Sequence, residues 1–185
     1  MNYFSSNFKL GILGGGQLGK MLLAETRKFD IQTFVLDPSE ESPCKIACNQ
    51  FFLGDLTDFD TVYNFGKQVN VLTFEIELVN VEALERLEKE GVKVYPSSET
   101  LRKIQNKGNQ KDLYKKNKIP TADYERFSGI VALKVKVEKN QIQLPFVWKC
   151  TEFGYDGNGV KIIRQRSDLD SLPNVECIAE EMIPF

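Results

Sequence analysis

The amino-acid sequence predicts an α/β fold: a parallel β-sheet with helices on both sides, followed by a smaller α+β unit. Two observations predict it. Short apolar runs alternate with helical patterns as far as residue 95, as in a parallel sheet covered by helices. Beyond Pro96 the chain becomes strongly polar, and beyond Pro120 its apolar segments are mostly strand-like. We therefore predict a domain at 1–96, a helical connector at 97–119 and a second domain at 120–185.

The elements of the first domain follow from the spacing of its apolar residues. The clearest helix is 81–90, because Val81, Leu84 and Leu87 recur at helical spacing and Gly91 follows as a stop signal. In chain order, we predict strands at 9–13, 32–36, 51–53, 71–74 and 92–95, and helices at 18–29, 59–68 and 81–90.

The second domain is predicted to consist mainly of strands, at 145–150, 160–163 and 175–180, with a glycine-rich loop at 154–159. The segment 131–139 is ambiguous. Val131, Leu133, Val135 and Val137 alternate as in a strand, and the charged residues Lys134, Lys136 and Glu138 lie between or directly after them.

Composition excludes several kinds of chemistry. The 185 residues include no histidine, so a Ser-His or Cys-His nucleophile pair and a histidine metal ligand are excluded. Four cysteines lack the spacing of a zinc or redox motif, and we expect them to be reduced structural thiols. The net charge of −2 gives no indication of a basic surface for nucleic acid. No apolar run is long enough to span a membrane. Without a recognisable secretion signal, a cytoplasmic location is expected.

The first glycine-rich turn runs from Gly14 to Gly19 between a predicted strand and helix. It satisfies G-x-G-x-x-G, and Asp37 ends the next predicted strand, where a ribose-binding acid would lie. Glycines and free helix-start amides suit an anion. Three interpretations stay open: a dinucleotide site, a site for another phosphate or polar ligand, and a tight turn that binds nothing.

The second glycine-rich segment, 153–160, lies between two predicted strands and suits a lid over nucleotide phosphates. Lys149, just before it, could place an ammonium against an α- or β-phosphate. The alternative is a hairpin in which Asp-Gly and Asn-Gly only supply turn geometry. At the last strand, Glu180 to Ile183 could read an adenine edge and hold ribose hydroxyls, although any sheet edge that ends in acids looks similar.

Together these motifs resemble the ATP-grasp superfamily and, within it, the N5-carboxyaminoimidazole ribonucleotide synthetase family. The Gly-Gln-Leu-Gly turn and the Gly-Tyr-Asp-Gly loop are the most specific. The matching segments occur in the family's order and cover nearly the whole chain: 14–21, 73–77, 105–111, 119–121, 145–149, 154–159 and 180–185.

The resemblance implies a Rossmann-like pre-ATP-grasp domain followed by the first part of an ATP-grasp domain. It also implies site residues. For ATP these are Lys107, Lys149, Gly154, Tyr155, Asp156, Gly157, Asn158, Gly159, Val160, Glu180, Glu181, Met182 and Ile183. For aminoimidazole ribonucleotide and bicarbonate they are Gly16, Gln17, Leu18, Glu75 and Glu77, with Tyr155, Asp156 and Glu75 in catalytic roles.

The reaction implied is that of a carbon–nitrogen ligase of purine biosynthesis. ATP phosphorylates bicarbonate to carboxyphosphate, which carboxylates the ribonucleotide amine. This suits a chain without histidine, because phosphoryl transfer relies mainly on positioning and cationic groups. The family also implies Mg²⁺, with ligands expected beyond Phe185 and none in this chain, and a homodimer. Since the family continues for about the same length again, we expect 185 residues alone to be an incomplete enzyme.

Two residues depart from the family pattern. Asn158 stands where the loop usually has a basic residue, and Lys107 stands where arginine is common, which keeps the charge but loses the bidentate fork. Two other hypotheses remain: a dinucleotide-dependent oxidoreductase built on the first glycine turn, and a related ATP-grasp enzyme or silent binding module with another ligand.

Overall fold

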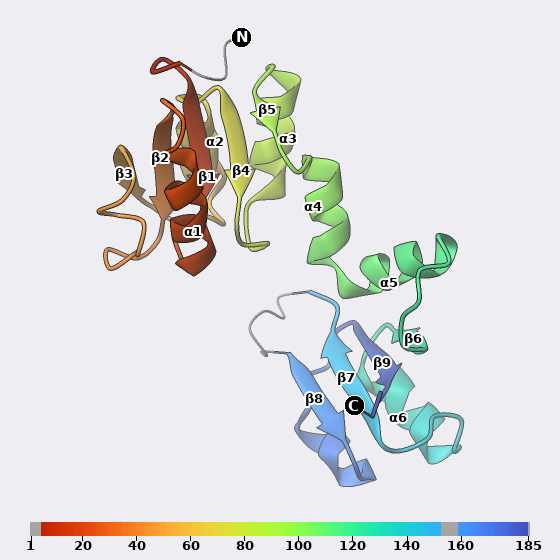
Figure 1. Ribbon diagram of the computed structural model, residues 1–185. Coiled ribbons are helices and arrows are strands. Elements are labelled where there is room, and N and C mark those ends of the chain that lie inside the picture. Colours follow the sequence, from red (N-terminus) through yellow and green to blue (C-terminus); the bar gives the residue numbers. More distant parts are fainter. Residues whose placement is uncertain (1–4, 153–158, 185) are drawn as a thin grey trace. The chain divides into compact units, whose positions relative to one another are not determined.

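The computed structural model describes residues 5–152 and 159–184 (Figure 1). By its internal contacts the chain divides into two compact units, Met1–Arg102 and Lys103–Phe185. The first contains a parallel sheet and the second an antiparallel sheet, so the predicted fold class is confirmed.

The first unit is a five-stranded parallel sheet in the order β3-β2-β1-β4-β5. Its strands are β1 (Lys9–Leu13), β2 (Gln32–Asp37), β3 (Gln50–Leu53), β4 (Val71–Phe74) and β5 (Lys93–Val94). The order reverses at β1, which pairs with β2 on one side and β4 on the other. In open α/β sheets, ligands bind outside the carboxyl ends of the strands at such a reversal. The topology therefore places the candidate crevice between the ends of β1 and β4.

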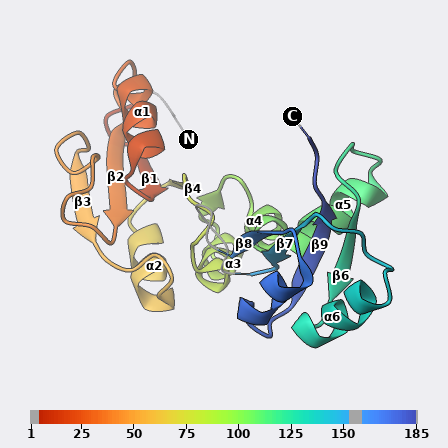
Figure 2. The ribbon, with the colours of Figure 1, turned by 90° about the horizontal axis from the view of Figure 1, so that it is seen from below.

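Helices cover both faces of this sheet, as predicted. Helix α1 (Gln17–Thr26) lies on one face, where Ile12, Leu23 and Val35 form a buried cluster. Helices α2 (Phe59–Gly66) and α3 (Val81–Lys89) lie on the other face (Figures 1 and 2). Both begin at an N-cap whose side chain accepts a hydrogen bond from a helix amide: Asp58 for α2 and Asn80 for α3.

Helix α4 (Ser98–Gln105) follows β5 and is tied to α3. The Ser98 amide donates to Glu88 at 3.1 Å, Leu101 is fully buried in the core of the first unit, and Arg102 pairs with Glu82 and Glu85. Up to Arg102, this polar helix is therefore held on the first unit.

The second unit contains a four-stranded antiparallel sheet in the order β6-β9-β7-β8. Its strands are β6 (Tyr124–Phe127), β7 (Phe146–Cys150), β8 (Val160–Ile163) and β9 (Cys177–Glu181). Helix α5 (Lys107–Lys116) lies on one face of the sheet and α6 (Ile130–Glu138) on the other (Figure 2). A short 3-10 helix, η1 (Arg166–Ser171), packs beside α6.

Helix α6 resolves the ambiguous segment 131–139 in favour of a helix. Ile130, Leu133 and Val137, at helical spacing, are buried against the sheet, whereas Val131 remains 64% exposed. The alternation of β-branched residues suggested a strand, but only one side of the segment meets apolar partners. Burial of the helical stripe therefore outweighs local β-propensity.

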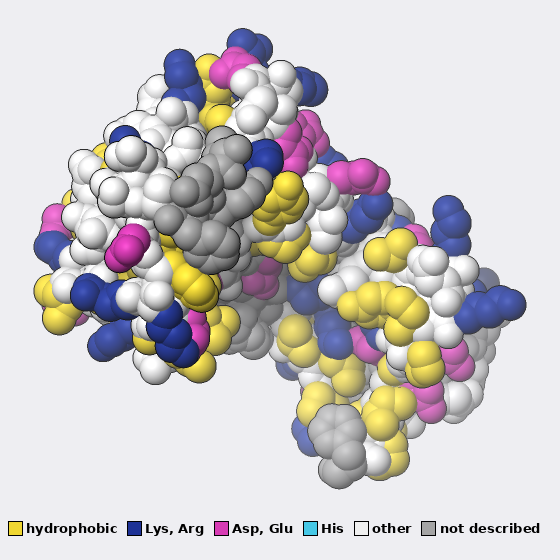
Figure 3. Space-filling model, turned by 45° about the horizontal axis from the view of Figure 1, so that its top comes forward, with side chains coloured by type: hydrophobic (Ala, Val, Ile, Leu, Met, Phe, Trp, Pro, Cys, Tyr) yellow, Lys and Arg dark blue, Asp and Glu magenta, His cyan; other side chains and the backbone are white. Residues whose placement is uncertain are grey.

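The surface carries mixed charge. Over the face shown in Figure 3, lysine and arginine side chains are interspersed with acidic ones. Within the described part of the chain, none of the helices has the length and apolar character needed to cross a membrane.

Candidate functional site

The glycine turn of the first unit is shaped by the side chains around it. Gly14 has φ of +94°, which favours glycine, and an added Cβ would lie 2.7 Å from Glu75 Oε1. At Gly15 an added Cβ would lie 2.2 Å from Ser42 Oγ. These glycines are therefore required by packing within the protein, whatever the turn binds.

Two carboxylates accept hydrogen bonds from the backbone amides of this turn. The Gly15 N–H donates to Asp37 Oδ2 at 2.6 Å, and the Gly16 N–H donates to Glu75 Oε1 at 3.0 Å. A dinucleotide diphosphate would have to displace both acceptors and would face their negative charge. The geometry therefore argues against the dinucleotide interpretation, and Asp37 holds the turn instead of lying ready for a ribose.

The remaining predicted substrate residues lie around the turn. Gln17 and Leu18 begin α1 and are exposed, and Glu77 is exposed two residues after Glu75. Helix α1 has no side-chain cap and no acidic residue in its first turn. The structure thus brings Gly16 into contact with Glu75 at the crevice and leaves the start of α1 accessible.

In the second unit, one sheet face combines apolar and charged side chains. Phe146, Trp148 and Cys150 point into the core with α6, so Val147 and Lys149 point to the opposite face, which we call the open face. The strand register places Val160, Ile162, Ile178 and Glu180 on the open face as well. Val160 and Ile162 are exposed, which leaves an apolar strip beside Lys149.

Glu180 lies at the centre of the charges on the open face. It is 7% exposed, and its two carboxylate oxygens contact two lysines: Oε1 contacts Lys111 Nζ and Oε2 contacts Lys149 Nζ. Burial raises the pKa of the Glu180 carboxyl, but the contacts with Lys111 and Lys149 outweigh it and hold the pKa below its ordinary value. Glu180 is therefore ionised at neutral pH.

The start of α5 is anchored beside the end of β7. Asn106 caps the helix by accepting from the Asn109 amide at 2.9 Å, and its side-chain amide donates to Glu152 at 3.1 Å. The Lys107 amide donates to the Thr151 carbonyl oxygen at 2.8 Å. Lys107 and Lys149 therefore both lie near the point where β7 leads into the second glycine-rich segment.

Further contacts fix α5 across β6. Arg126 donates to Asp112 at 2.6 Å and to Glu176 at 2.7 Å, and Tyr124 donates to Asp112 at 2.5 Å. An added Cβ at Gly108 would lie 2.7 Å from the Arg126 guanidinium, so a larger residue there would displace the guanidinium from this position.

Much of the predicted ATP loop, namely Gly154, Tyr155, Asp156, Gly157 and Asn158, lies outside the described residues. Gly159 and Val160 are described: the Gly159 carbonyl oxygen accepts from the Cys150 amide at 2.9 Å, and Val160 begins β8. At the other end, Glu181 ends β9 and its amide donates to the Asp123 carbonyl oxygen at 2.8 Å, while Met182 and Ile183 follow without regular structure.

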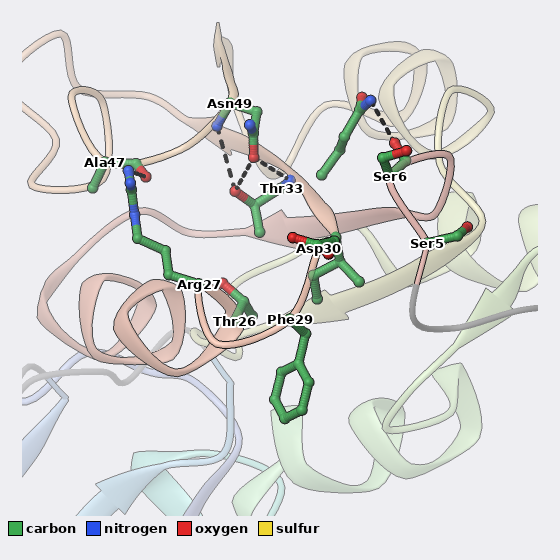
Figure 4. A pocket seen from close by; sticks show the side chains of 11 residues that line it. Ser5, Ser6, Thr26, Arg27, Phe29, Asp30, Thr33, Ala47 and Asn49 are labelled. Atoms are coloured by element: carbon green, nitrogen blue, oxygen red, sulfur yellow. Dashed lines mark hydrogen bonds between the residues drawn. The ribbon is translucent and has the colours of Figure 1, made fainter.

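A polar hollow of about 580 Å³ lies elsewhere in the first unit, at the amino end of β2 (Figure 4). Arg27 donates to the Ala47 carbonyl oxygen at 2.7 Å, and Thr33 is hydrogen-bonded to Asn49. Since ligands of such sheets bind at the carboxyl ends of the strands, this hollow is not the candidate crevice.

Comparison with known proteins agrees with this geometry. The family model for the ribonucleotide synthetase preATP-grasp domain matches residues 8–105, more than half of the chain. The chain belongs to this family. The ATP-grasp domain matches residues 112–185, which include the second half of α5 and the whole antiparallel sheet.

Two kinds of relative show the extent of the likeness. The N5-carboxyaminoimidazole ribonucleotide synthase of Pseudomonas aeruginosa is 33% identical over 96% of this chain and 49% of its own length. The crystal structure of the Aspergillus clavatus synthase complexed with ATP covers 97% of this chain and 48% of its own, with 33% identity and a TM-score of 0.87. A second structure of the A. clavatus enzyme, with ADP and 5-aminoimidazole ribonucleotide, gives 32% identity and a TM-score of 0.83, covering 98% of this chain and 47% of its own. The chain spans about half the length of the synthases it matches.

Sequence reasoning did not single out Lys111, which is the buried partner of Glu180. It did single out Asp37, but as a ribose-binding acid, whereas Asp37 accepts a hydrogen bond from the glycine turn. Lys111 lies in a predominantly polar helix, where no periodicity distinguishes a buried lysine from exposed ones. The available signal was its position in the segment 105–111, which resembles the family.

Proposed function

We propose that the protein catalyses the ATP-dependent carboxylation of 5-aminoimidazole ribonucleotide in de novo purine biosynthesis. The products would be N5-carboxyaminoimidazole ribonucleotide, ADP and phosphate. The observation that carries the proposal is the likeness along 98% of this chain to a synthase crystallised with ADP and this ribonucleotide. The electrostatics of the two candidate sites supply physical support.

The open face of the second unit suits a nucleotide. Val147, Val160 and Ile162 offer an apolar surface to a base, and Lys149 offers a cation to the phosphates. Glu180 is an ionised acceptor for nucleoside hydroxyl or amino groups. We assign Lys107, residues 154–160 and the strand end 181–183 to the same nucleotide, as the family pattern implies.

The crevice of the first unit suits a ligand that donates hydrogen bonds. Because the carboxylates of Asp37 and Glu75 already accept from the turn amides, the crevice favours amine and hydroxyl donors over a diphosphate. The uncapped start of α1, at Gln17 and Leu18, offers free amides to a single phosphate. We assign Glu77, Tyr155 and Asp156 to the same substrates.

The proposed reaction needs no covalent protein nucleophile. A bicarbonate oxygen attacks the γ-phosphorus of ATP, the bond to the β-phosphate oxygen breaks, and carboxyphosphate and ADP form. The ribonucleotide amine then attacks the carboxyl carbon and expels phosphate, losing one proton. Lys149 and Lys107 would stabilise phosphate charge in the first step.

Mg²⁺ normally accompanies ATP in such enzymes and would neutralise phosphate charge. Among the described residues, no three cysteine, aspartate or glutamate side chains cluster closely enough to hold a metal ion. We therefore assign no metal ligand within these residues. A cytoplasmic homodimer that acts on small molecules, without nucleic acid or membrane, completes the proposal.

The test is ADP release by the natural gene product, measured with and without the ribonucleotide and bicarbonate. We expect release to require both, and N5-carboxyaminoimidazole ribonucleotide to accumulate in proportion. Release that ignores the ribonucleotide but responds to another acceptor would indicate a related ATP-grasp enzyme. Tight NADH binding without ADP release would instead favour the oxidoreductase.

A matched variant tests the assignment of Asp156. If its side chain orients the ribonucleotide amine, Asp156→Asn lowers turnover far more than it weakens ATP binding. Equal losses in turnover and ATP binding would show that the loop serves the nucleotide alone.

A further inference from the structure

Lys111 is an unusual lysine because its ammonium group is buried and fully engaged. The residue is 8% exposed. Its Nζ donates to Glu180 Oε1, to Thr121 Oγ1 and to the Ala122 carbonyl oxygen, the last at 3.4 Å. An ammonium has three donors, so these partners use all of them. Lys111 is therefore not available to a ligand.

Lys149 differs from Lys111 although both contact the same carboxylate. Its side chain remains 27% exposed on the open face, and among the described residues its ammonium group contacts Glu180 Oε2 alone. Oε1 of Glu180 is thus held by a lysine whose donors are all used, whereas Oε2 is held by a lysine that has donors left for another partner.

We propose that Lys111 is a positioning residue for the ATP site: it holds the Glu180 carboxylate ionised and in place, so that Lys149 can move to a nucleotide phosphate while Oε2 accepts a hydrogen bond from the nucleoside. The inference rests on the proposed function for ATP binding, not for the carboxylation. Lys111 itself touches no substrate in this scheme.

The charge count explains why a second lysine is needed. A buried carboxylate that loses its only cation is left uncompensated, which is costly in a medium of low polarity. With Lys111 in place, departure of Lys149 still leaves Glu180 paired. Among residues 5–152 and 159–184, the groups placed against Glu180 are Lys111 from α5, Lys149 from β7 and the uncharged Tyr124, its cross-strand neighbour on β6.

Removal of Lys111 has a specific consequence for pH dependence. Burial raises the pKa of the Glu180 carboxyl, and contacts with Lys111 and Lys149 hold it low. Without Lys111, once Lys149 had bound a phosphate, no lysine contact would oppose the effect of burial on the pKa of Glu180. Glu180 would then bind a proton more readily as the pH falls, and the protonated carboxyl could no longer accept through a charged oxygen.

The test measures the dissociation constant of a non-hydrolysable ATP analogue by calorimetry, at pH 6.5 and 8.5, with the natural gene product. We expect Lys111→Met to weaken binding about tenfold or more at pH 6.5, relative to the wild type at the same pH. The loss should shrink at pH 8.5. Lys149→Met should weaken binding equally at both pH values, since it removes a phosphate contact directly.

Two further variants separate this role from a structural one. Lys136→Met removes an ion pair with Glu125 on the opposite face of the same sheet and should leave binding unchanged. The double variant Lys111→Met/Glu180→Gln leaves no unpaired carboxylate, so it remains informative even if Lys111→Met fails to fold. It should bind the analogue as Glu180→Gln does.

Binding by Lys111→Met that matches the wild type at both pH values would overturn the inference. So would a double variant that binds more weakly than Glu180→Gln, because Lys111 would then act independently of Glu180. Wild-type binding of the analogue without ribonucleotide-dependent ADP release would refute the carboxylation alone. A wild type that binds no analogue would refute both.

Discussion

Glu75 holds the glycine turn from across the crevice, so its removal should destabilise the first unit in a measurable way. Its Oε1 accepts from the Gly16 amide at 3.0 Å. Glu75→Ala removes a hydrogen bond to a charged group, worth about 1.5–3 kcal/mol. Glu75→Gln keeps an oxygen acceptor of the same reach and should cost less than about 1 kcal/mol.

We therefore expect Glu75→Ala to lower the free energy of unfolding of the first unit by about 2 kcal/mol, and its Tm by about 8–16 °C, as the scaling for a unit of about 100 residues gives. Thermal unfolding followed by far-ultraviolet circular dichroism measures this, since the single tryptophan, Trp148, lies in the other unit. Hydrogen exchange at the Gly16 amide, followed by NMR, reports on the bond itself. Exchange should accelerate in Glu75→Ala and stay close to the wild-type rate in Glu75→Gln.

Glu41→Ala is the matched control, because Glu41 is an exposed glutamate of the same unit. It should leave both Tm and Gly16 exchange unchanged. If Gly16 exchanges at the wild-type rate in Glu75→Ala, the carboxylate does not hold the turn, and the argument against a diphosphate in the crevice loses its basis.

Three further predictions concern the second unit and the thiols. Burial raises the pKa of Glu180 but its lysine contacts hold it low, so its ionised form stabilises the fold above its ordinary pKa of 4.5. Unfolding by urea should show this contribution lost as pH falls below 4.5, with a shallower fall in Glu180→Gln. Burial raises the pKa of Cys44 to about 11, so mass spectrometry after iodoacetamide treatment at pH 7.5 should find Cys48, which is less buried, modified first. In α6, Leu133→Ala should cost about 2–5 kcal/mol in urea unfolding, and Val131→Ala less than about 0.5 kcal/mol; equal costs would contradict the assigned helix faces.

The pattern of apolar residues was enough to predict the first unit. The central strands β1 and β2 are compact apolar runs with consecutive buried residues, and helix α3 carries its apolar residues at regular spacing, so local sequence and burial agree. In α6 they conflict, because its β-branched residues alternate while only the sheet-facing side is buried. Strand β6 was missed, since Tyr124 to Phe127 includes two charged residues that hydrogen-bonding partners elsewhere in the chain accommodate.

The candidate sites likewise combine features that the sequence predicted with features that it did not. Motif order and composition by themselves determined the family, the two glycine segments, and the reliance on carboxylates and lysines in a chain without histidine. Only tertiary structure decided that Asp37 and Glu75 occupy the turn amides, and that Lys111 and Lys149 share Glu180. Lys111 and Glu180 are 69 positions apart. Their pairing depends on α5 lying over β9, and burial then turns an ordinary ion pair into one whose charges must be balanced.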